Sequence, residues 1–144
     1  MLVLFVIVYI LVIWILVSTS EPANFRRVKE MYRTLIDHIK EHNTDPRFDV
    51  LKTETVLVAY KGRTSEIGYN TNKGYEIGLC IDGEPNQIFH VLLHELAHCT
   101  VDDYEHNSNF WKNFDDLKAI CTKIGLYKTI PQKEVFCGKH IQDI

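Results

Sequence analysis

The sequence has few cysteines, and no two of the four form a C-x-x-C pair. The spacing therefore argues against a cysteine zinc knuckle. An even count permits disulfides, but nothing in the sequence requires one, and scattered thiols are typical of a reducing compartment. We interpret all four as small, buried apolar residues: Cys80, Cys99, Cys121 and Cys137.

An excess of positive charge is also missing. The chain of 144 residues has 16 Lys and Arg against 19 Asp and Glu, which gives a formal net charge of −3. This balance argues against a permanently basic surface for nucleic acid. The length suits one domain with a modest core, and the sequence contains no internal repeat.

The first 20 residues carry no charge, and residues 1–17 also lack Gly and Pro. A run of this length and composition is about what a membrane-spanning helix needs, whereas a core helix is rarely apolar on every face. A cleaved signal peptide is the alternative, with Ser18 and Ser20 as the small residues at its cleavage site. The run lacks a basic n-region and exceeds the usual ~7–15 apolar residues, so we predict an uncleaved anchor over residues 1–20.

The charges beside this segment predict its orientation. Arg26, Arg27, Lys29 and Arg33 follow it, and no Lys or Arg precedes it. The positive-inside rule then predicts a single-pass membrane protein whose soluble part, residues 21–144, lies on the cytosolic side.

Periodicity in the soluble part predicts an α+β domain. Apolar residues at helical spacing indicate a helix from Asn24, its N-cap, to about Glu41, and a second helix over 108–124 that ends at Gly125. Trp111 is expected to widen the apolar core face of the second helix. β-Formers indicate a strand over 55–60 and a short last strand over 135–137.

A hairpin is predicted in the middle of the chain. Its arms are residues 67–70 and 75–81, and its turn is at 72–74. The second arm alternates apolar and polar residues, which is typical of a strand with one buried face. We expect this arm to be an edge strand, which can bind an extended peptide by β-augmentation.

Residues 94–98 read His-Glu-Leu-Ala-His, and each residue type has a chemical role. On a helix, His94 and His98 share one face and lie about 6 Å apart along the axis, so their neutral imidazoles can bind one Zn²⁺. Glu95 stands where a metalloprotease has its general base. The flanking residues are apolar, and a buried helix accepts such polar groups only if they are paired or bind a metal. A chance match to the short pattern is the alternative.

Zinc usually takes a third protein ligand, and His106 is our candidate. Seven residues separate it from His98, which leaves room for the chain to turn back. The compact metzincin pattern does not fit, because its glycine and its spacing are both missing. The alternatives for the third ligand are Glu105 or an aspartate, and Glu134.

Three other polar residues near the motif need an interpretation. One helix cannot easily present three residues over two turns to one tetrahedral ion, so we expect His90 to be packed beside the ligands. His140 is expected at the surface. Tyr104 is either a structural tyrosine or a donor that stabilises an oxyanion.

The motif and its surroundings resemble the WLM/SprT-like (spartan-like) zinc metallopeptidases. In that family HExxH is followed by a loop of variable length and a third histidine in an H-x-x-x-F frame, as in residues 94–98 and 106–111 here. Asn72-Lys73, Ile77-Gly78-Leu79-Cys80 and Phe136-Cys137-Gly138 are similar to short forms encoded by large DNA viruses, which often begin with a hydrophobic segment. The resemblance covers residues 55–144.

The resemblance implies a small minigluzincin-like α+β fold, with helices and a short, mostly antiparallel sheet. It implies that His94, His98 and His106 bind zinc and that Glu95 is the catalytic base. The resulting hypothesis is a membrane-anchored zinc endopeptidase that acts on a protein or peptide. Some family members cleave proteins crosslinked to DNA, but the anchor and the acidic soluble part depart from them. A non-catalytic, zinc-stabilised binding module is the second alternative.

Overall fold

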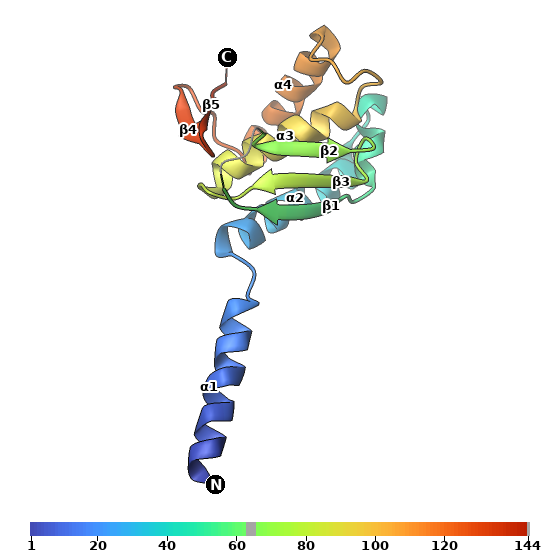
Figure 1. Ribbon diagram of the computed structural model, residues 1–144. Coiled ribbons are helices and arrows are strands. Elements are labelled where there is room, and N and C mark those ends of the chain that lie inside the picture. Colours follow the sequence, from blue (N-terminus) through green and yellow to red (C-terminus); the bar gives the residue numbers. More distant parts are fainter. Residues whose placement is uncertain (63–65, 144) are drawn as a thin grey trace.

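The computed structural model describes residues 1–62 and 66–143, and it begins with an apolar helix that projects from the rest of the chain (Figure 1). This helix, α1 (Leu2–Ser18), has no buried residue. Within the described residues no single helix is long and apolar enough to cross a membrane. Helices α1 and α2 (Ala23–His42), which meet at a bend of 48°, are long and apolar enough only when they are taken together.

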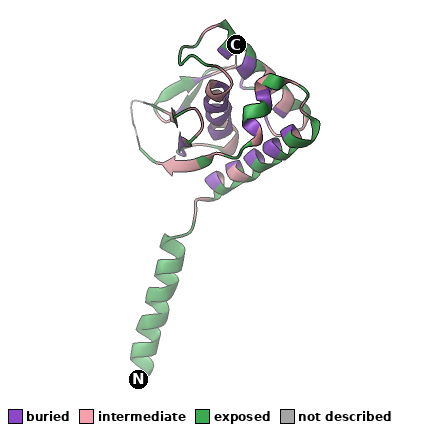
Figure 2. Ribbon diagram, turned by 90° about the vertical axis from the view of Figure 1, so that its right-hand side faces the viewer, coloured by how far each residue is buried: buried purple, intermediate pink, exposed green. Residues whose placement is uncertain are grey.

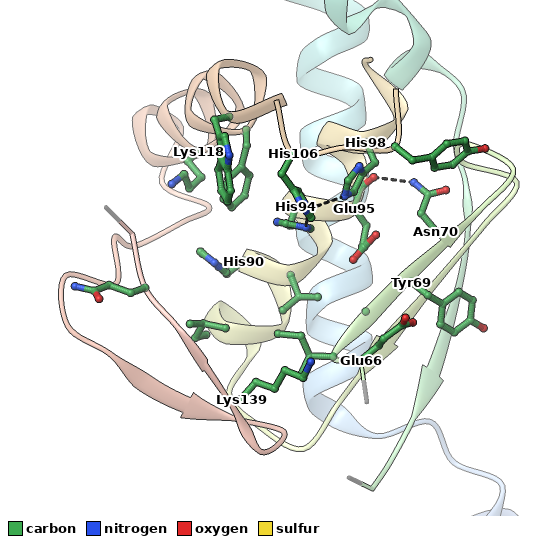
Figure 3. Close-up of a pocket in the computed structure, with 18 of the residues that line it drawn as sticks. Glu66, Tyr69, Asn70, His90, His94, Glu95, His98, His106, Lys118 and Lys139 are labelled. Carbon is green, nitrogen blue, oxygen red and sulfur yellow. Dashed lines mark hydrogen bonds between the residues drawn. The ribbon is translucent and has the colours of Figure 1, made fainter. Parts of the chain in front are cut away.

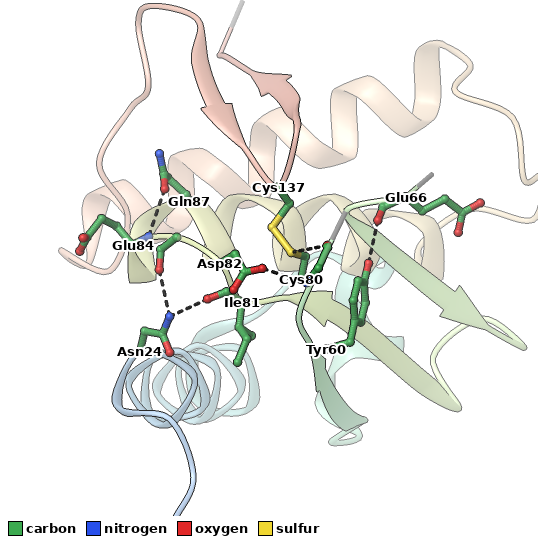
Figure 4. Close-up of a disulfide and its surroundings, with 11 residues drawn as sticks. Asn24, Tyr60, Glu66, Cys80, Ile81, Asp82, Glu84, Gln87 and Cys137 are labelled. Carbon is green, nitrogen blue, oxygen red and sulfur yellow. Dashed lines mark hydrogen bonds between the residues drawn. A yellow bond between two sulfur atoms is a disulfide. The ribbon is translucent and has the colours of Figure 1, made fainter. Parts of the chain in front are cut away.

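Helix α2 confirms the predicted amphipathic helix and covers one face of the sheet (Figure 1). Its buried residues are apolar and recur at helical spacing: Phe25, Val28, Met31, Tyr32, Leu35, Ile36 and Ile39. The predicted N-cap is wrong, because Pro22 holds that position. The Asn24 side chain instead donates to the carbonyls of Ile81 and Gly83 and ties α2 to the segment before α3 (Figure 4). A 3₁₀ helix, η1 (Pro46–Lys52), follows α2.

The sheet contains β1 (Val56–Tyr60), β2 (Gly68–Thr71) and β3 (Glu76–Cys80) in the order β1-β3-β2. Strands β2 and β3 confirm the predicted hairpin, and β1 pairs with β3 in parallel. The prediction of an edge strand directly before the motif helix is wrong, since β3 is central and β2 is at the edge. The sheet is also mixed rather than mostly antiparallel. The predicted single buried face is wrong as well, because residues 77–80 are all buried, as suits a central strand. Alternation in the sequence does not report the order of strands in a sheet.

Helix α3 (Pro85–Cys99) lies at the centre of the domain, between the sheet and α2 on one side and α4 (Ser108–Lys123) on the other (Figure 1). Pro85 occupies its first turn, and Glu84 and Gln87 form a reciprocal capping box. This cap satisfies backbone N–H groups that have no helical partner. The apolar residues of α3 form much of the buried interior in Figure 2. The motif therefore lies on a helix fixed from several sides.

The chain ends in a hairpin of β4 (Glu134–Phe136) and β5 (Lys139–Ile141), of which only the first strand was predicted. A disulfide joins Cys137, in the hairpin turn, to Cys80 at the end of β3 (Figure 4). The interpretation of all four cysteines as unpaired apolar residues is therefore wrong for this pair, which lies 57 residues apart in sequence. Cys99 and Cys121 are free.

Candidate metal centre

The structure brings His94, His98 and His106 together at one point (Figure 3). Helix α3 presents the first two, and His106 comes from the loop before α4. The Nε2 atom of His106 lies 3.0 Å from that of His94 and 3.1 Å from that of His98. A tetrahedral ion with Zn–N bonds of about 2.0–2.1 Å needs nitrogens about 3.3 Å apart, so this spacing fits zinc.

The protonation of the two helix histidines also suits a metal. Burial, followed by the neighbouring histidines, lowers the pKa of His94 to about 3. Burial, followed by His106 and Lys73, lowers the pKa of His98 to about 4. Both imidazoles are therefore neutral near pH 7, which is the form that ligates metal ions.

The Phe110 ring packs against the imidazole rings of all three histidines. It is fully buried in the first turn of α4, and its ring centroid lies 4.9, 4.4 and 4.6 Å from those of His94, His98 and His106. Phe110 follows His106 by four residues, so the H-x-x-x-F frame places the His106 imidazole against the Phe110 ring. The Nδ1 atom of His98 is buried without a hydrogen-bond partner among the described residues. A metal on Nε2 would leave the proton on this nitrogen.

Glu95 lies beside the three histidines, on the side of α3 that faces strand β2 (Figure 3). It is 7% exposed, and burial, followed by the charge of Glu66, raises its pKa to about 7. A carboxyl group with a pKa near 7 can both accept and return a proton at neutral pH.

Gly68 allows β2 to approach this carboxyl group. A Cβ atom at Gly68 would lie 2.6 Å from Val91 Cγ1 and 2.9 Å from Glu95 Oε1. A glycine within a strand often marks a close approach of another segment, so Gly68 is the one sequence signal for this contact, although it lies outside the predicted site.

A pocket of about 850 Å³ opens over the histidines and Glu95. One wall is the edge strand β2, and the opposite wall is β5 with the residue after it. Trp111 is 46% exposed and lines this pocket, so the expectation that it joins the core face of its helix is wrong. His140 is exposed, as expected, but it also lines the pocket, as does Tyr104, which is 68% exposed.

The remaining predicted candidates lie outside the histidine cluster. His90 is buried, as expected, and its Nδ1 lies 2.8 Å from the Tyr127 hydroxyl. That hydroxyl donates to Asp143, which also accepts from Lys118. None of the alternative third ligands, which were Glu105 or an aspartate, and Glu134, joins the metal-ligand group found among the described residues, which is His94, His98 and His106. Glu134 lies in β4 and accepts a bond from Gln87.

Family and structure comparisons relate this chain to known proteins. The WLM domain model matches residues 29–141. Wss1 from Saccharomyces cerevisiae has a similar structure, with 24% identity over 74% of this chain and 88% of that chain and a TM-score of 0.52. The metallopeptidase zymogen abylysin of Pyrococcus abyssi is more distant, with 21% identity over 65% of this chain and 94% of that chain and a TM-score of 0.37.

The family match does not separate short viral forms from other members. No curated protein matches the sequence. The likeness to Wss1 supports the α+β fold, and the WLM model covers most of the chain. This chain therefore belongs to the WLM domain family.

Proposed function

We propose that this protein is a zinc-dependent endopeptidase held at a membrane by α1. The observation that carries the proposal is the convergence of three imidazole nitrogens beside a buried carboxyl group whose pKa is about 7. Membership of the WLM family supports a metal-dependent protease that acts on proteins or peptides. The membrane, the metal and the individual roles of the residues are parts of the proposal.

In this proposal His94, His98 and His106 hold zinc through their Nε2 atoms. Zinc, when bound, supplies a Lewis acid that polarises the scissile carbonyl and lowers the pKa of the attacking water. Glu95 accepts a proton from that water on its carboxylate and delivers it to the nitrogen of the leaving amine. Each proton that Glu95 takes up is returned within one turnover, so the carboxylate is regenerated.

The pocket walls suggest how a peptide binds. Among the described residues, strand β2 pairs with β3 along one side only, so its other side offers backbone groups to an extended chain. The same strand presents Gly68 next to Glu95, so a peptide added to β2 would pass beside the proposed base. Trp111 offers an apolar contact in the pocket for a substrate side chain.

The composition of α1 supports membrane insertion. All its residues are exposed to solvent and apolar up to Val17, which is unfavourable in water. The hydroxyl groups of Ser18, Thr19 and Ser20 donate to the carbonyls of Trp14, Ile15 and Val17. Their polar groups are thereby satisfied within the helix, which lowers the cost of extending the inserted segment to residue 20.

The orientation across the membrane has an experimental answer. The basic residues after α1 favour a cytosolic catalytic domain, whereas the Cys80–Cys137 disulfide favours an oxidising compartment. Protease protection of the domain in sealed vesicles distinguishes the two. We propose the cytosolic side. In sealed vesicles whose cytosolic face points outward, the protease should then digest the domain. Protection of the domain until the vesicles are opened would contradict the proposal.

Substitution of the proposed base tests the chemistry. Glu95→Gln should keep a stoichiometric zinc and lose cleavage of a peptide library, because an amide cannot accept the proton. Glu41→Gln, at an exposed position of α2, is the matched control and should cleave like the wild type. Undiminished proteolysis by Glu95→Gln would refute this mechanism.

The same assays address the two alternatives. DNA-stimulated autocleavage would indicate a protease of DNA-crosslinked proteins, although the net charge of −3 opposes DNA binding. Zinc-dependent folding without cleavage of any peptide would indicate a non-catalytic binding module.

A further inference from the structure

The turn that joins β2 to β3 has an unusual backbone. Asn72, Lys73 and Gly74 all have positive φ angles, of 48°, 52° and 102°. This conformation suits glycine and is unfavourable for a lysine. Such a conformation persists only where the surrounding structure imposes it, so the contacts of this turn need an explanation.

The turn is attached to the last turn of α3. Asn70 donates through Nδ2 to the Glu95 carbonyl oxygen at 2.8 Å (Figure 3) and accepts from the Gly74 N–H at 2.7 Å. A Cβ atom at Gly74 would lie 3.0 Å from Cys99 Sγ, so the turn rests against the end of α3. The backbone of the turn is therefore fixed relative to the helix that carries His94 and His98.

From this fixed turn, the Lys73 side chain reaches the loop that follows α3. Its Nζ donates to the carbonyl oxygens of Val101 at 2.5 Å, of Asp102, and of Asp103 at 3.0 Å. It also lies 4.4 Å from the ring centroid of Tyr104. An ammonium group has three N–H donors, so all of them are used on three consecutive carbonyls of one loop.

This loop connects the second histidine of the cluster to the third. Residues 102–105 are exposed, so apolar burial does not hold them in place, whereas the His106 ring that follows packs against Phe110. At the far end Asn107 caps α4 by accepting from the Phe110 N–H at 3.0 Å. Between the end of α3 and this cap, the three hydrogen bonds of Lys73 connect the loop carbonyls to the β2–β3 turn among the described residues.

We propose that Lys73 is a positioning residue that fixes the loop 101–105 and thereby places His106 for metal binding. This inference rests on the proposed function, because it assumes that His106 is a zinc ligand. Lys73 does not act on the substrate in this account, because its donors are already occupied. Its role is to reduce the freedom of the segment that carries the third ligand.

The test is the zinc affinity of the full-length protein in detergent micelles, measured by competition with a chelator. Lys73→Met should weaken zinc binding about 10- to 100-fold, the size of effect seen when a group that supports a metal ligand is lost. Lys40→Met, at an exposed position of α2, is the matched control and should bind zinc like the wild type. The melting temperature of the metal-free protein, measured in parallel, reports a purely structural effect.

A double-mutant cycle shows whether Lys73 acts through His106. In a His106→Ala background, Lys73→Met should weaken zinc binding no further. Lys73→Arg serves as a second variant, because it keeps a positive charge at this position of the turn. A planar guanidinium cannot direct three N–H groups from one nitrogen at three carbonyls, so the arginine variant should also bind zinc more weakly than the wild type.

The outcomes separate this inference from the proposed function. Wild-type zinc affinity in Lys73→Met or, should that variant not fold, in Lys73→Arg would overturn the inference and leave the zinc site standing. Independent, additive effects of Lys73→Met and His106→Ala would also overturn it. A wild-type protein that binds no zinc would overturn the proposed function and this inference together.

Discussion

Gly68→Ala tests the contact between the edge strand and the proposed base. The new methyl group would lie 2.6 Å from Val91 Cγ1, whereas carbon atoms pack at about 3.5–4.0 Å, so strand and helix must separate by about 1 Å. The φ angle of Gly68 is not positive, so the effect is steric rather than conformational. Overpacking of this kind costs about 1–3 kcal/mol of stability. A shift of about 1 Å in a catalytic group can lower turnover about 100-fold.

The assay compares kcat and the free energy of unfolding for Gly68→Ala and Gly78→Ala. The second variant is a matched control, because the three atoms nearest to its methyl group would all belong to the Tyr69 ring, with Cε1 at 1.9 Å. Both variants should be less stable, but only Gly68→Ala should lose kcat when both are fully folded. A Gly68→Ala variant with the kcat of the control would refute the reasoning that β2 sets the position of Glu95.

The remaining predictions concern stability. Reduction of the Cys80–Cys137 disulfide should lower the free energy of unfolding by about 4 kcal/mol, given the 57-residue separation, and a Cys80→Ser variant should no longer respond to a thiol reductant in urea denaturation. An unchanged midpoint after reduction of the wild type would contradict this. Burial raises the pKa of Asp143, but bonds from the Ile130 N–H, Lys118 and Tyr127 outweigh it, so the pKa is lowered overall. Because the pKa of Asp143 is lower in the folded than in the unfolded protein, its carboxylate stabilises the fold at pH values above the unfolded-state pKa of about 4. This contribution is lost as the pH falls through the folded-state pKa. Asp143→Asn should therefore cost about 3 kcal/mol at pH 7 and progressively less as the pH falls from about 4 through the lowered folded-state pKa, and a cost that does not change with pH would contradict the assignment.

The sequence was sufficient to predict the parts of the site that depend on local periodicity. The apolar spacing around residues 94–98 predicted a buried helix, and helical geometry then placed His94 and His98 on one face. The turn at 72–74 and its two strands were also predicted, because turn residues and alternation are local signals.

What could not be predicted depends on contacts between distant segments. The pairing of Cys80 with Cys137 needs the position of the last hairpin, which no local pattern supplies. The central place of β3 depends on its parallel pairing with β1, which lies before the hairpin in sequence. Trp111 fits a helical apolar stripe, but the stripe does not reveal that a pocket lies beside it. The Lys73 contacts belong to the same class, since they join a turn to a loop 28–30 residues later.

The zinc content of the purified full-length protein tests the central claim most directly. After dialysis the wild type should contain one zinc per chain. Under the same conditions His106→Ala should lose most of its zinc, because the two histidines on α3 are too few protein ligands to retain it. A wild type without zinc, or a stoichiometric zinc that survives His106→Ala, would contradict the three-histidine site.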